Sequence, residues 1–243
     1  MTAILLAAGV GKRLLGPGAG RPKCLLEIGG RSLLTRLLEG LAAAGVREAV
    51  VVTGFEEAAV REHLAQPPPG LTVHCRTNPR YREGAILSLW TAREVLAGPV
   101  VVMDADVLCP PAMVALLIRS PHRNCFLLDA SVEPTGEEQM LLVRGTRVVD
   151  IVRGGAPGYD LAGESVGFLK LSAGAASVLR ELLAVSVAAG RTGIEHEEVY
   201  PELLQRVEVG FERVDGMPWT EIDFAGDVAR AEAEILPRID GLR

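Results

Sequence analysis

An alternation of short apolar runs with helical stripes through the first half of the chain is the feature that most constrains its fold. Residues 3–8, 49–53 and 100–103 are apolar runs of strand length. Between the first two runs, leucines recur at 34, 37, 38 and 41, which is the spacing of a core-facing helix. Strands that alternate with helices predict parallel βαβ units. The sequence therefore predicts an α/β fold that begins with parallel strands.

The second half of the chain shows a different pattern, in which strands follow one another more often than helices. A hairpin turned at Gly145 is the clearest example. We therefore predict a mixed, mainly parallel sheet. The remaining predicted elements are helices at 56–66, 84–96, 175–182 and 228–235 and strands at 71–76, 126–132, 140–143, 147–152, 164–171 and 207–214.

Composition limits the class of protein. The 243 residues suffice for one α/β domain, so we predict a single domain over 1–243. A net charge of −6 and 4% aromatic residues argue against a nucleic-acid partner. No apolar run reaches the roughly 18 residues of a membrane span, and the first run lacks the basic flank of a signal peptide. The four cysteines have no metal-binding spacing, so a cytoplasmic protein with reduced thiols is expected.

A glycine turn with basic residues follows the first predicted strand. It reads Gly9-Val10-Gly11-Lys12-Arg13, and Pro22-Lys23 comes about ten residues later. Glycines let backbone N–H groups approach a ligand, and cations favour negative charge, so this segment is suited to a polyphosphate. A Walker loop is excluded because Arg13 stands where Ser or Thr is required, and the dinucleotide fingerprint because Leu14 replaces its third glycine. A plain strand-to-helix turn with surface charges is the alternative.

Two aspartates end the predicted strand at 100–103. The carboxyl ends of parallel strands are where α/β sheets bind ligands, so Asp104 and Asp106 are candidates for a metal site. If the strand continued, they would point to opposite sides, and at most one would face a given ion. An Asx turn or helix cap before Pro110 is the alternative. Asp223, before the last helix, is either a ligand or a helix cap, and Asp227 fits the cap equally well.

The segment Glu195-His196-Glu197-Glu198 resembles a zinc motif only in part. A zinc-binding HExxH needs a second histidine where Tyr200 stands. We expect a solvated, acidic helix start here.

Several motifs together resemble the nucleotidyltransferase superfamily, including its MobA-like and sugar-phosphate members. Residues 6–14 match the LAAGxGxRL signature, and residues 22–26 match PKxLL. The segments at 78–84, 103–106 and 219–223 are similar to those of phosphocholine and inositol-1-phosphate cytidylyltransferases. The resemblance covers nearly the whole chain. It implies a Rossmann-like three-layer α/β/α architecture of the nucleotide-diphospho-sugar transferase type.

The resemblance also implies a role for each matching residue. Arg13 and Lys23 would be catalytic, because they would neutralise the phosphates and the departing pyrophosphate. Asp106 and Asp223 would hold Mg²⁺, with Asp104 beside the nucleotide and Glu221 in support. The family's paired asparagines are replaced by Gly84-Ala85, and its lysine after the strand at 148–152 by Arg153. Nucleotide contacts would come from Leu6, Ala7, Ala8, Gly9, Gly11, Asn78, Gly84 and Ser88.

The predicted activity is a Mg²⁺-dependent transfer of CMP from CTP to a small phosphorylated alcohol, with release of pyrophosphate. Phosphocholine or a similar amino-alcohol phosphate or phosphonate is the expected acceptor, and a homodimer is one assembly to test. A sugar-1-phosphate or inositol-1-phosphate nucleotidyltransferase is the alternative enzyme, and a non-catalytic nucleotide-sensing subunit is the alternative outside enzymes. Candidate acceptor residues are Arg153, Tyr159, Glu198, Tyr200, Trp219 and Glu221.

Overall fold

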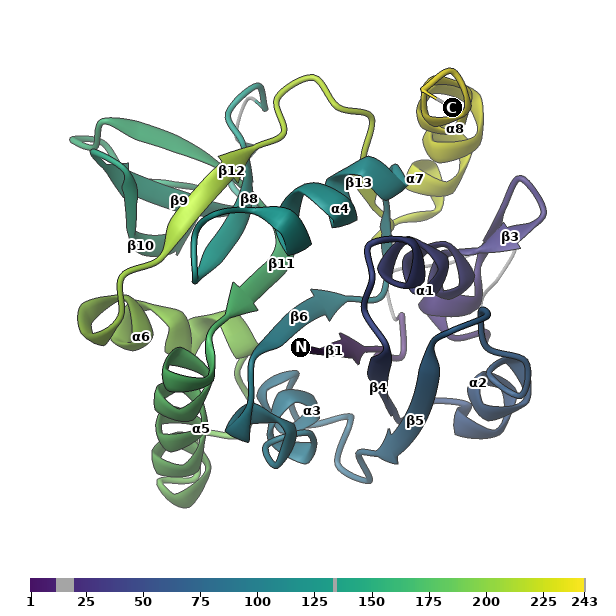
Figure 1. Cartoon of the computed structure of the whole chain (residues 1–243), viewed down its shortest axis with the longest axis horizontal. Coiled ribbons are helices and arrows are strands. Elements are labelled where there is room, and N and C mark those ends of the chain that lie inside the picture. Colours follow the sequence, from purple (N-terminus) through teal and green to yellow (C-terminus); the bar gives the residue numbers. More distant parts are fainter. Residues whose placement is uncertain (12–19, 133–134, 243) are drawn as a thin grey trace.

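The computed structural model describes residues 1–11, 20–132 and 135–242 and is built around a nine-stranded mixed sheet (Figure 1). Four parallel strands run in the order β6, β1, β4, β5, and β11 joins them to β9 and β10 by antiparallel pairing. These features confirm the predicted α/β fold with a mixed, mainly parallel sheet. The strands are β1 Thr2–Leu6, β4 Glu48–Thr53, β5 Thr72–Thr77, β6 Val100–Asp104, β8 Cys125–Asp129, β9 Gln139–Arg144, β10 Arg147–Arg153, β11 Leu161–Leu171 and β12 Gly210–Arg213.

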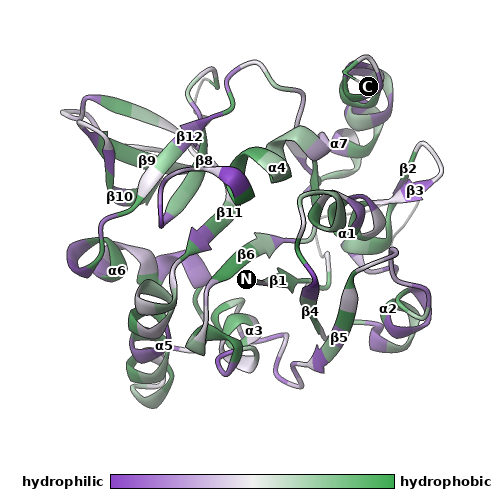
Figure 2. Ribbon diagram, viewed as in Figure 1, coloured by the Kyte–Doolittle hydropathy of each residue, from purple (hydrophilic) through white to green (hydrophobic). Residues whose placement is uncertain are grey.

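Helices cover both faces of the sheet, because successive side chains of a buried strand point to opposite faces. Ala3 and Leu5 of β1 belong to one buried cluster with α1, α2 and α4, whereas Ile4 belongs to a second with α3, α5 and α6. Figure 2 shows β1 and β6 as mostly hydrophobic and the outer helices as mixed. The helices are α1 Leu33–Ala43, α2 Glu57–His63, α3 Ile86–Thr91, α4 Pro111–Arg119, α5 Ala173–Ala188 and α6 Tyr200–Arg206.

Short elements complete the chain and carry residues to the ends of the strands. A 3-10 turn, η1, spans Lys23–Leu25, and another, η3, spans His196–Val199. The strand pair β7 Val107–Leu108 and β13 Thr220–Glu221 lies beyond β6. Helices α7 Ala225–Arg230 and α8 Leu236–Asp240, joined by the π-helical turn Ala231–Ile235, end the described chain. Within the described ranges, no helix is both long and apolar enough to cross a membrane.

Several predicted elements have different bounds in the structure. The helix predicted at 84–96 begins later, as α3, and breaks before a 3-10 turn at Val95–Ala97. Its first residues are held by another segment, since Ile86 donates its N–H to the Ile194 carbonyl at 3.1 Å. The last helix begins at Ala225 and is divided into three pieces. The strand predicted at 207–214 is shorter, because only Gly210–Arg213 pairs with β8.

Candidate active site

A cleft of about 540 Å³ opens where the carboxyl ends of β1 and β6 meet. Its two walls come from different halves of the chain, and β6 lies between them because it is flanked by β1 and β11 in the sheet. The N-terminal wall consists of lining residues 6, 8–11, 23, 81–85 and 88, and the C-terminal wall of residues 137–139, 153, 164–167 and 195–197. The floor consists of Asp104, Asp106, Val107, Glu221, Asp223 and Phe224.

Lys23 joins two aspartates from distant parts of the chain on this floor. Its ammonium group lies 3.3 Å from the Asp106 carboxylate and forms an ion pair with the Asp223 carboxylate. Local backbone contacts fix both acids. Ile222 donates its N–H to the Asp106 carbonyl at 3.1 Å, and the Asp227 carboxylate accepts the N–H of Asp223 at 2.9 Å. Asp227 is therefore the capping residue, and Asp223 is available to the floor.

The pKa values of Lys23, Asp106 and Glu221 are shifted because these groups are buried close together. Burial alone would lower the pKa of Lys23, but Asp106, Asp223 and Glu221 outweigh it and raise the pKa. Burial raises the pKa of Asp106, with Lys23 opposing. Desolvation in the cleft and the neighbouring carboxylates of Asp106, Asp223 and Asp104 raise the pKa of Glu221 to about 9. The floor carries more negative charge than Lys23 can balance, so it favours a further cation.

The oxygens of three carboxylates are suitably placed for that cation. Ligand atoms of Asp106, Glu221 and Asp223 all lie within 4.8 Å of one another. Carboxylate oxygens are hard ligands, and Mg²⁺ is typically held by one or two carboxylates together with water and phosphate oxygens. The donor set therefore fits Mg²⁺, and it includes both aspartates that the family resemblance singled out.

Asp104 faces the same cleft as Asp106, contrary to the expectation for a continuing strand. The chain turns at Ala105-Asp106 instead of extending, so both carboxylates reach the floor. The Asp104 carboxylate lies 3.0 Å from Nε2 of His196. Burial raises the pKa of Asp104 to about 6, although His196 opposes the shift.

His196 is buried, which corrects the expected solvated helix start. Its Nδ1 lies 3.1 Å from the Tyr200 hydroxyl and 3.3 Å from the Glu197 carboxylate. Burial alone would lower the pKa of His196, but Glu197, Asp104 and Glu195 raise it to about 10. An imidazolium thus lies at the boundary between the floor and the C-terminal wall. Its partner Asp104 is the last residue of β6, and no local spacing in the sequence signals that contact.

The N-terminal wall contains most of the predicted nucleotide residues. Leu6, Ala8, Gly9 and Gly11 line the cleft, and Ala7 is fixed below them by donating its N–H to the Val52 carbonyl at 2.9 Å. The predicted catalytic residue Arg13 lies outside the described residues.

The predicted base-binding residues differ in their access to the cleft. Gly84 and Ser88 line the cleft. Asn78 is buried, and its amide donates to the Ser88 hydroxyl at 3.1 Å, so it orients Ser88. Gly84 has a packing role as well, because a Cβ atom there would lie 2.8 Å from the Ile194 backbone nitrogen.

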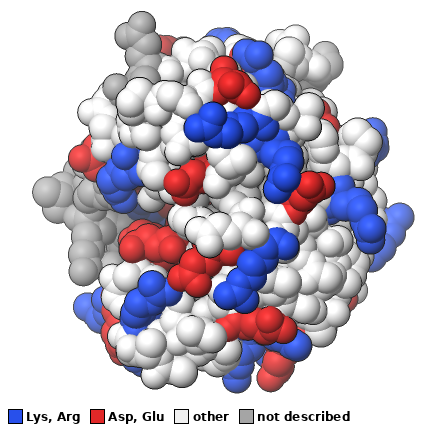
Figure 3. Space-filling model, turned by 90° about the vertical axis from the view of Figure 1, so that its left-hand side faces the viewer, with Lys and Arg blue, Asp and Glu red and all other residues white. Residues whose placement is uncertain are grey.

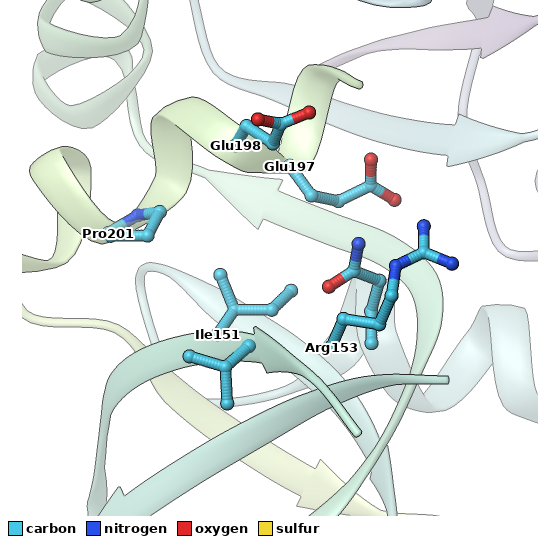
Figure 4. Close-up of a pocket in the computed structure, with 7 residues that line it drawn as sticks. Ile151, Arg153, Glu197, Glu198 and Pro201 are labelled. Carbon is cyan, nitrogen blue, oxygen red and sulfur yellow. The ribbon is translucent and has the colours of Figure 1, made fainter. Parts of the chain in front are cut away.

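A second pocket of about 450 Å³ adjoins the C-terminal wall (Figure 4). The two cavities share Gln139, Arg153 and Glu197. Figure 4 shows Arg153 and Glu197 reaching toward each other from β10 and η3. Arg153 also lies 3.2 Å from the Glu137 carboxylate. Glu198 lines only this second pocket, and its carboxylate accepts the Glu195 N–H at 3.0 Å as a helix cap.

The aromatic residues predicted to bind the acceptor lie elsewhere. The Tyr159 ring is covered by the Arg144 guanidinium, 4.9 Å from its centroid. Tyr200 is buried behind His196. The Trp219 indole N–H donates to the Asp129 carboxylate at 2.8 Å. None of the three lines either cavity among the described residues.

Charge on the C-terminal wall is mainly negative. Figure 3 shows acidic side chains gathered near the middle of one face, beside basic ones. The wall contains one described arginine, Arg153, and five glutamates. Sequence reasoning missed this wall because its acids come from separate segments, and only the fold brings them together. The five are Glu137, Glu138, Glu164, Glu195 and Glu197.

Comparison with known proteins places this geometry among transferases. A family model described as the MobA-like NTP transferase domain matches residues 3–156. A CMP-5′-(3-aminopropyl)phosphonate synthase from Streptomyces rubellomurinus is 35% identical over 133 residues, which cover 54% of this chain and 21% of that protein. A bifunctional IPC transferase and DIPP synthase from Rubrobacter xylanophilus is 31% identical over 240 residues, covering 96% of this chain and 52% of that protein.

Solved structures show the same fold. The CTP:phosphocholine cytidylyltransferase of Streptococcus pneumoniae superposes with a TM-score of 0.79 at 22% identity, covering 97% of this chain and 98% of that one. At this identity the likeness concerns the fold alone. The chain spans about half the length, or less, of the two curated relatives described above.

Proposed function

Because this chain belongs to the MobA-like NTP transferase family, we propose that it transfers CMP from CTP to a small amino-alcohol phosphate or phosphonate. The family match confirms the resemblance that the glycine signature and the Pro22-Lys23 segment indicated. The single observation that carries the proposal is the ion-pair cluster in which Lys23 joins Asp106 and Asp223. It combines a phosphate-binding cation with a carboxylate pair suited to a divalent ion.

In the proposed reaction, an oxygen of the acceptor's phosphate or phosphonate forms a bond to the α-phosphorus of CTP. The bond from that phosphorus to the oxygen bridging the β-phosphate breaks, and pyrophosphate leaves with its electron pair. A phosphate monoester is largely dianionic at neutral pH because its second pKa is about 6. The attacking oxygen therefore needs no general base, and catalysis depends on positioning and on charge neutralisation.

The residues of the cleft match these two requirements. Backbone N–H groups around Gly9 and Gly11 border the space for the triphosphate, and Lys23 is close enough to the floor to neutralise phosphate charge. Asp106, Asp223 and Glu221 would hold Mg²⁺, which supplies charge neutralisation and a fixed orientation of phosphate oxygens when bound. The buried Asn78 amide holds the Ser88 hydroxyl toward the space for the base.

The choice of nucleotide and acceptor in this proposal is based on two relatives. The Streptomyces protein is a CMP-5′-(3-aminopropyl)phosphonate synthase, and its name supports both CTP and an amino-phosphonate acceptor. The Rubrobacter protein, a bifunctional IPC transferase and DIPP synthase, aligns with nearly the whole chain. Inositol-1-phosphate, the alternative that the family resemblance implies, is the second candidate acceptor. Both candidate acceptors would react with the same nucleotide. They differ in the group that the C-terminal wall would bind.

Pyrophosphate release tests the proposal. CTP, UTP, GTP and ATP are each incubated with Mg²⁺ and with phosphoethanolamine, aminoethylphosphonate, phosphocholine, inositol-1-phosphate or glucose-1-phosphate. We expect release with CTP and an amino acceptor, and release with UTP and the sugar phosphate alone would contradict the cytidylyltransferase assignment. Asp106→Asn should lower kcat by at least about 100-fold, the effect of losing one electrostatic contact to the transition state. Glu208→Gln, whose side chain is 77% exposed, is the matched control and should retain activity.

A further inference from the structure

Glu164 differs from the other acids of the C-terminal wall in having no direct partner among the described residues. Glu137 is paired with Arg153, Glu138 accepts from the Thr135 hydroxyl at 2.6 Å, and Glu197 is paired with His196. The Glu195 side chain accepts the backbone N–H of Glu198 in a capping box. Among the residues that the structure describes, none forms a hydrogen bond or an ion pair with the Glu164 carboxylate.

The position of Glu164 follows from the sheet. β11 runs antiparallel to β6 with Phe168 opposite Met103, so residues before Phe168 extend past the carboxyl end of β6. Glu164 therefore lines the cleft beyond Asp104 and Asp106, on the side away from the glycine turn. A molecule that reached from the floor toward this wall would bring its far end to Glu164.

The surroundings of Glu164 favour a cationic partner. The side chain is half-buried, and desolvation together with Glu138 and Asp129 raises its pKa to about 7, with Arg230 opposing. An unpaired carboxylate in such a place is costly unless a cation joins it. A metal ion is disfavoured, since Glu164 belongs to neither group of described residues that could together hold one. An organic cation needs only one carboxylate.

The rings near that cation decide its type. Tyr81 and Phe224 also line the cleft, but they belong to its N-terminal wall and floor. Quaternary ammonium groups are recognised by aromatic faces. The only ring on the described C-terminal wall is the imidazole of His196, which is buried, cationic and bound at both nitrogens. A primary ammonium needs hydrogen-bond acceptors instead, and the wall offers carboxylates.

We propose that Glu164 binds the primary ammonium group of the acceptor and thereby selects primary amines over quaternary ones. The proposal rests on the function proposed above, and it concerns the same cleft. Glu164 acts at the end of the acceptor opposite the reacting phosphate. It determines specificity, and the bond-forming step does not involve it.

A methylation series tests the proposal with acceptors that differ only at nitrogen. Phosphoethanolamine, its N-methyl and N,N-dimethyl forms, and phosphocholine are compared with ethyl phosphate, which lacks the amine, using CTP and Mg²⁺. We expect kcat/KM to fall at least about 10-fold from the primary to the quaternary amine. For Glu164→Gln, kcat/KM with phosphoethanolamine should fall about 10- to 100-fold, the usual effect of losing a charged hydrogen bond, while ethyl phosphate should be unaffected.

Opposite results would overturn the proposal. If kcat/KM for phosphocholine equals kcat/KM for phosphoethanolamine, the proposed selection of primary amines is wrong. If Glu164→Gln lowers kcat/KM equally for ethyl phosphate and phosphoethanolamine, Glu164 is structural. Glu208→Gln serves as the control, because it removes an exposed carboxylate that lines neither cavity.

Calorimetry separates failure of this proposal from failure of the proposed function. If no acceptor gives pyrophosphate with CTP, the proposed function fails. Binding of phosphoethanolamine and of ethyl phosphate to the protein is then compared directly by isothermal titration. At least about 10-fold tighter binding of phosphoethanolamine, lost in Glu164→Gln, would support the ammonium site on its own. Equal binding, or no binding of either, would overturn it.

Discussion

At the scale of single residues, the cleft contains groups whose charge is favourable only when a ligand is present. Glu164 is the clearest case, because its carboxylate has no partner among the described residues. The raised pKa of about 7 means that the folded state holds the proton more tightly than the unfolded chain does. The folded protein therefore loses stability as pH rises from about 4.5 to about 7 through this residue.

Glu164→Gln should accordingly stabilise the ligand-free protein above pH 7. The gain should approach zero near pH 4.5 and grow to a plateau by pH 8, with an upper bound of about 3 kcal/mol from the size of the pKa shift. Thermal unfolding followed by circular dichroism at several pH values measures it. A variant that is less stable than the natural chain at pH 8 would show that Glu164 has a structural partner. Glu208→Gln is measured in parallel as the control for an exposed carboxylate that lines neither cavity.

His196 shows the opposite dependence, because its partners are already in place. With a folded-state pKa raised to about 10 by Glu197, Asp104 and Glu195 despite burial, the imidazolium stabilises the fold fully below about pH 6.5. That contribution is lost as pH rises toward 10. We therefore expect the difference in free energy of unfolding between the natural chain and His196→Gln to shrink between pH 7 and pH 10. Denaturant titrations at pH 7, 8.5 and 10 measure this trend, and a constant difference would contradict it.

At the scale of elements, the site depends on the contact between the start of α3 and the segment 192–194. α3 begins where the Ile194 carbonyl accepts the Ile86 N–H, and Gly84 permits that approach. A Cβ at Gly84 would collide with the Thr192 carbonyl and lie 2.8 Å from the Ile194 nitrogen. Because the backbone cannot yield as a flexible side chain does, the whole 192–196 segment must shift, and His196 with it.

Gly84→Ala should therefore destabilise the protein by about 1–3 kcal/mol, the usual cost of overpacking. It should also weaken activity, since the shift reaches the C-terminal wall. Gly174→Ala in α5 is the matched control, because nothing lies within 4 Å of its added Cβ, and it should stabilise the protein by about 0.5–1 kcal/mol. Urea unfolding of both variants provides the comparison. Equal effects would mean that the contact with 192–194 is unimportant.

These elements also show how far the sequence alone reaches. The apolar runs of β1, β4 and β6 and the leucine stripe of α1 were predictable, because burial follows a local period. The start of α3 was not, since a contact with Ile194 fixes where that helix begins. The sequence predicted a solvated His196. Its burial could not be predicted, because its partner Asp104 lies 92 positions away. The motifs located Lys23, Asp106 and Asp223, but Glu164 belongs to no motif and is identified only by its surroundings.

At the scale of the whole molecule, the floor combines residues from the middle and the last part of the chain, and Lys23 adds a residue from the first part. Lys23 and Asp223 are 200 positions apart, so their ion pair requires the last segment to return to the first helical turn. Three contacts hold the segment 219–235 against the rest of the structure. β13 pairs with β7, a small apolar cluster joins α1's first residue Leu33 to Ile222 and Ile235, and the Trp219 indole bonds to buried Asp129.

Trp219→Phe tests whether the contact between Trp219 and Asp129 positions the proposed metal ligands of the floor. Phenylalanine keeps most of the packing but removes the N–H that satisfies Asp129, which costs about 1–3 kcal/mol for a buried acceptor left unsatisfied. Because Asp223 lies four residues further on, we also expect a higher Mg²⁺ concentration for half-maximal pyrophosphate release. Trp90→Phe is the matched control, since the Trp90 ring packs under Arg93, 4.5 Å from its centroid, outside the cleft. That variant should leave the Mg²⁺ requirement unchanged. If Trp219→Phe lowers stability without changing the Mg²⁺ requirement, the terminal segment supports the fold but does not position the floor.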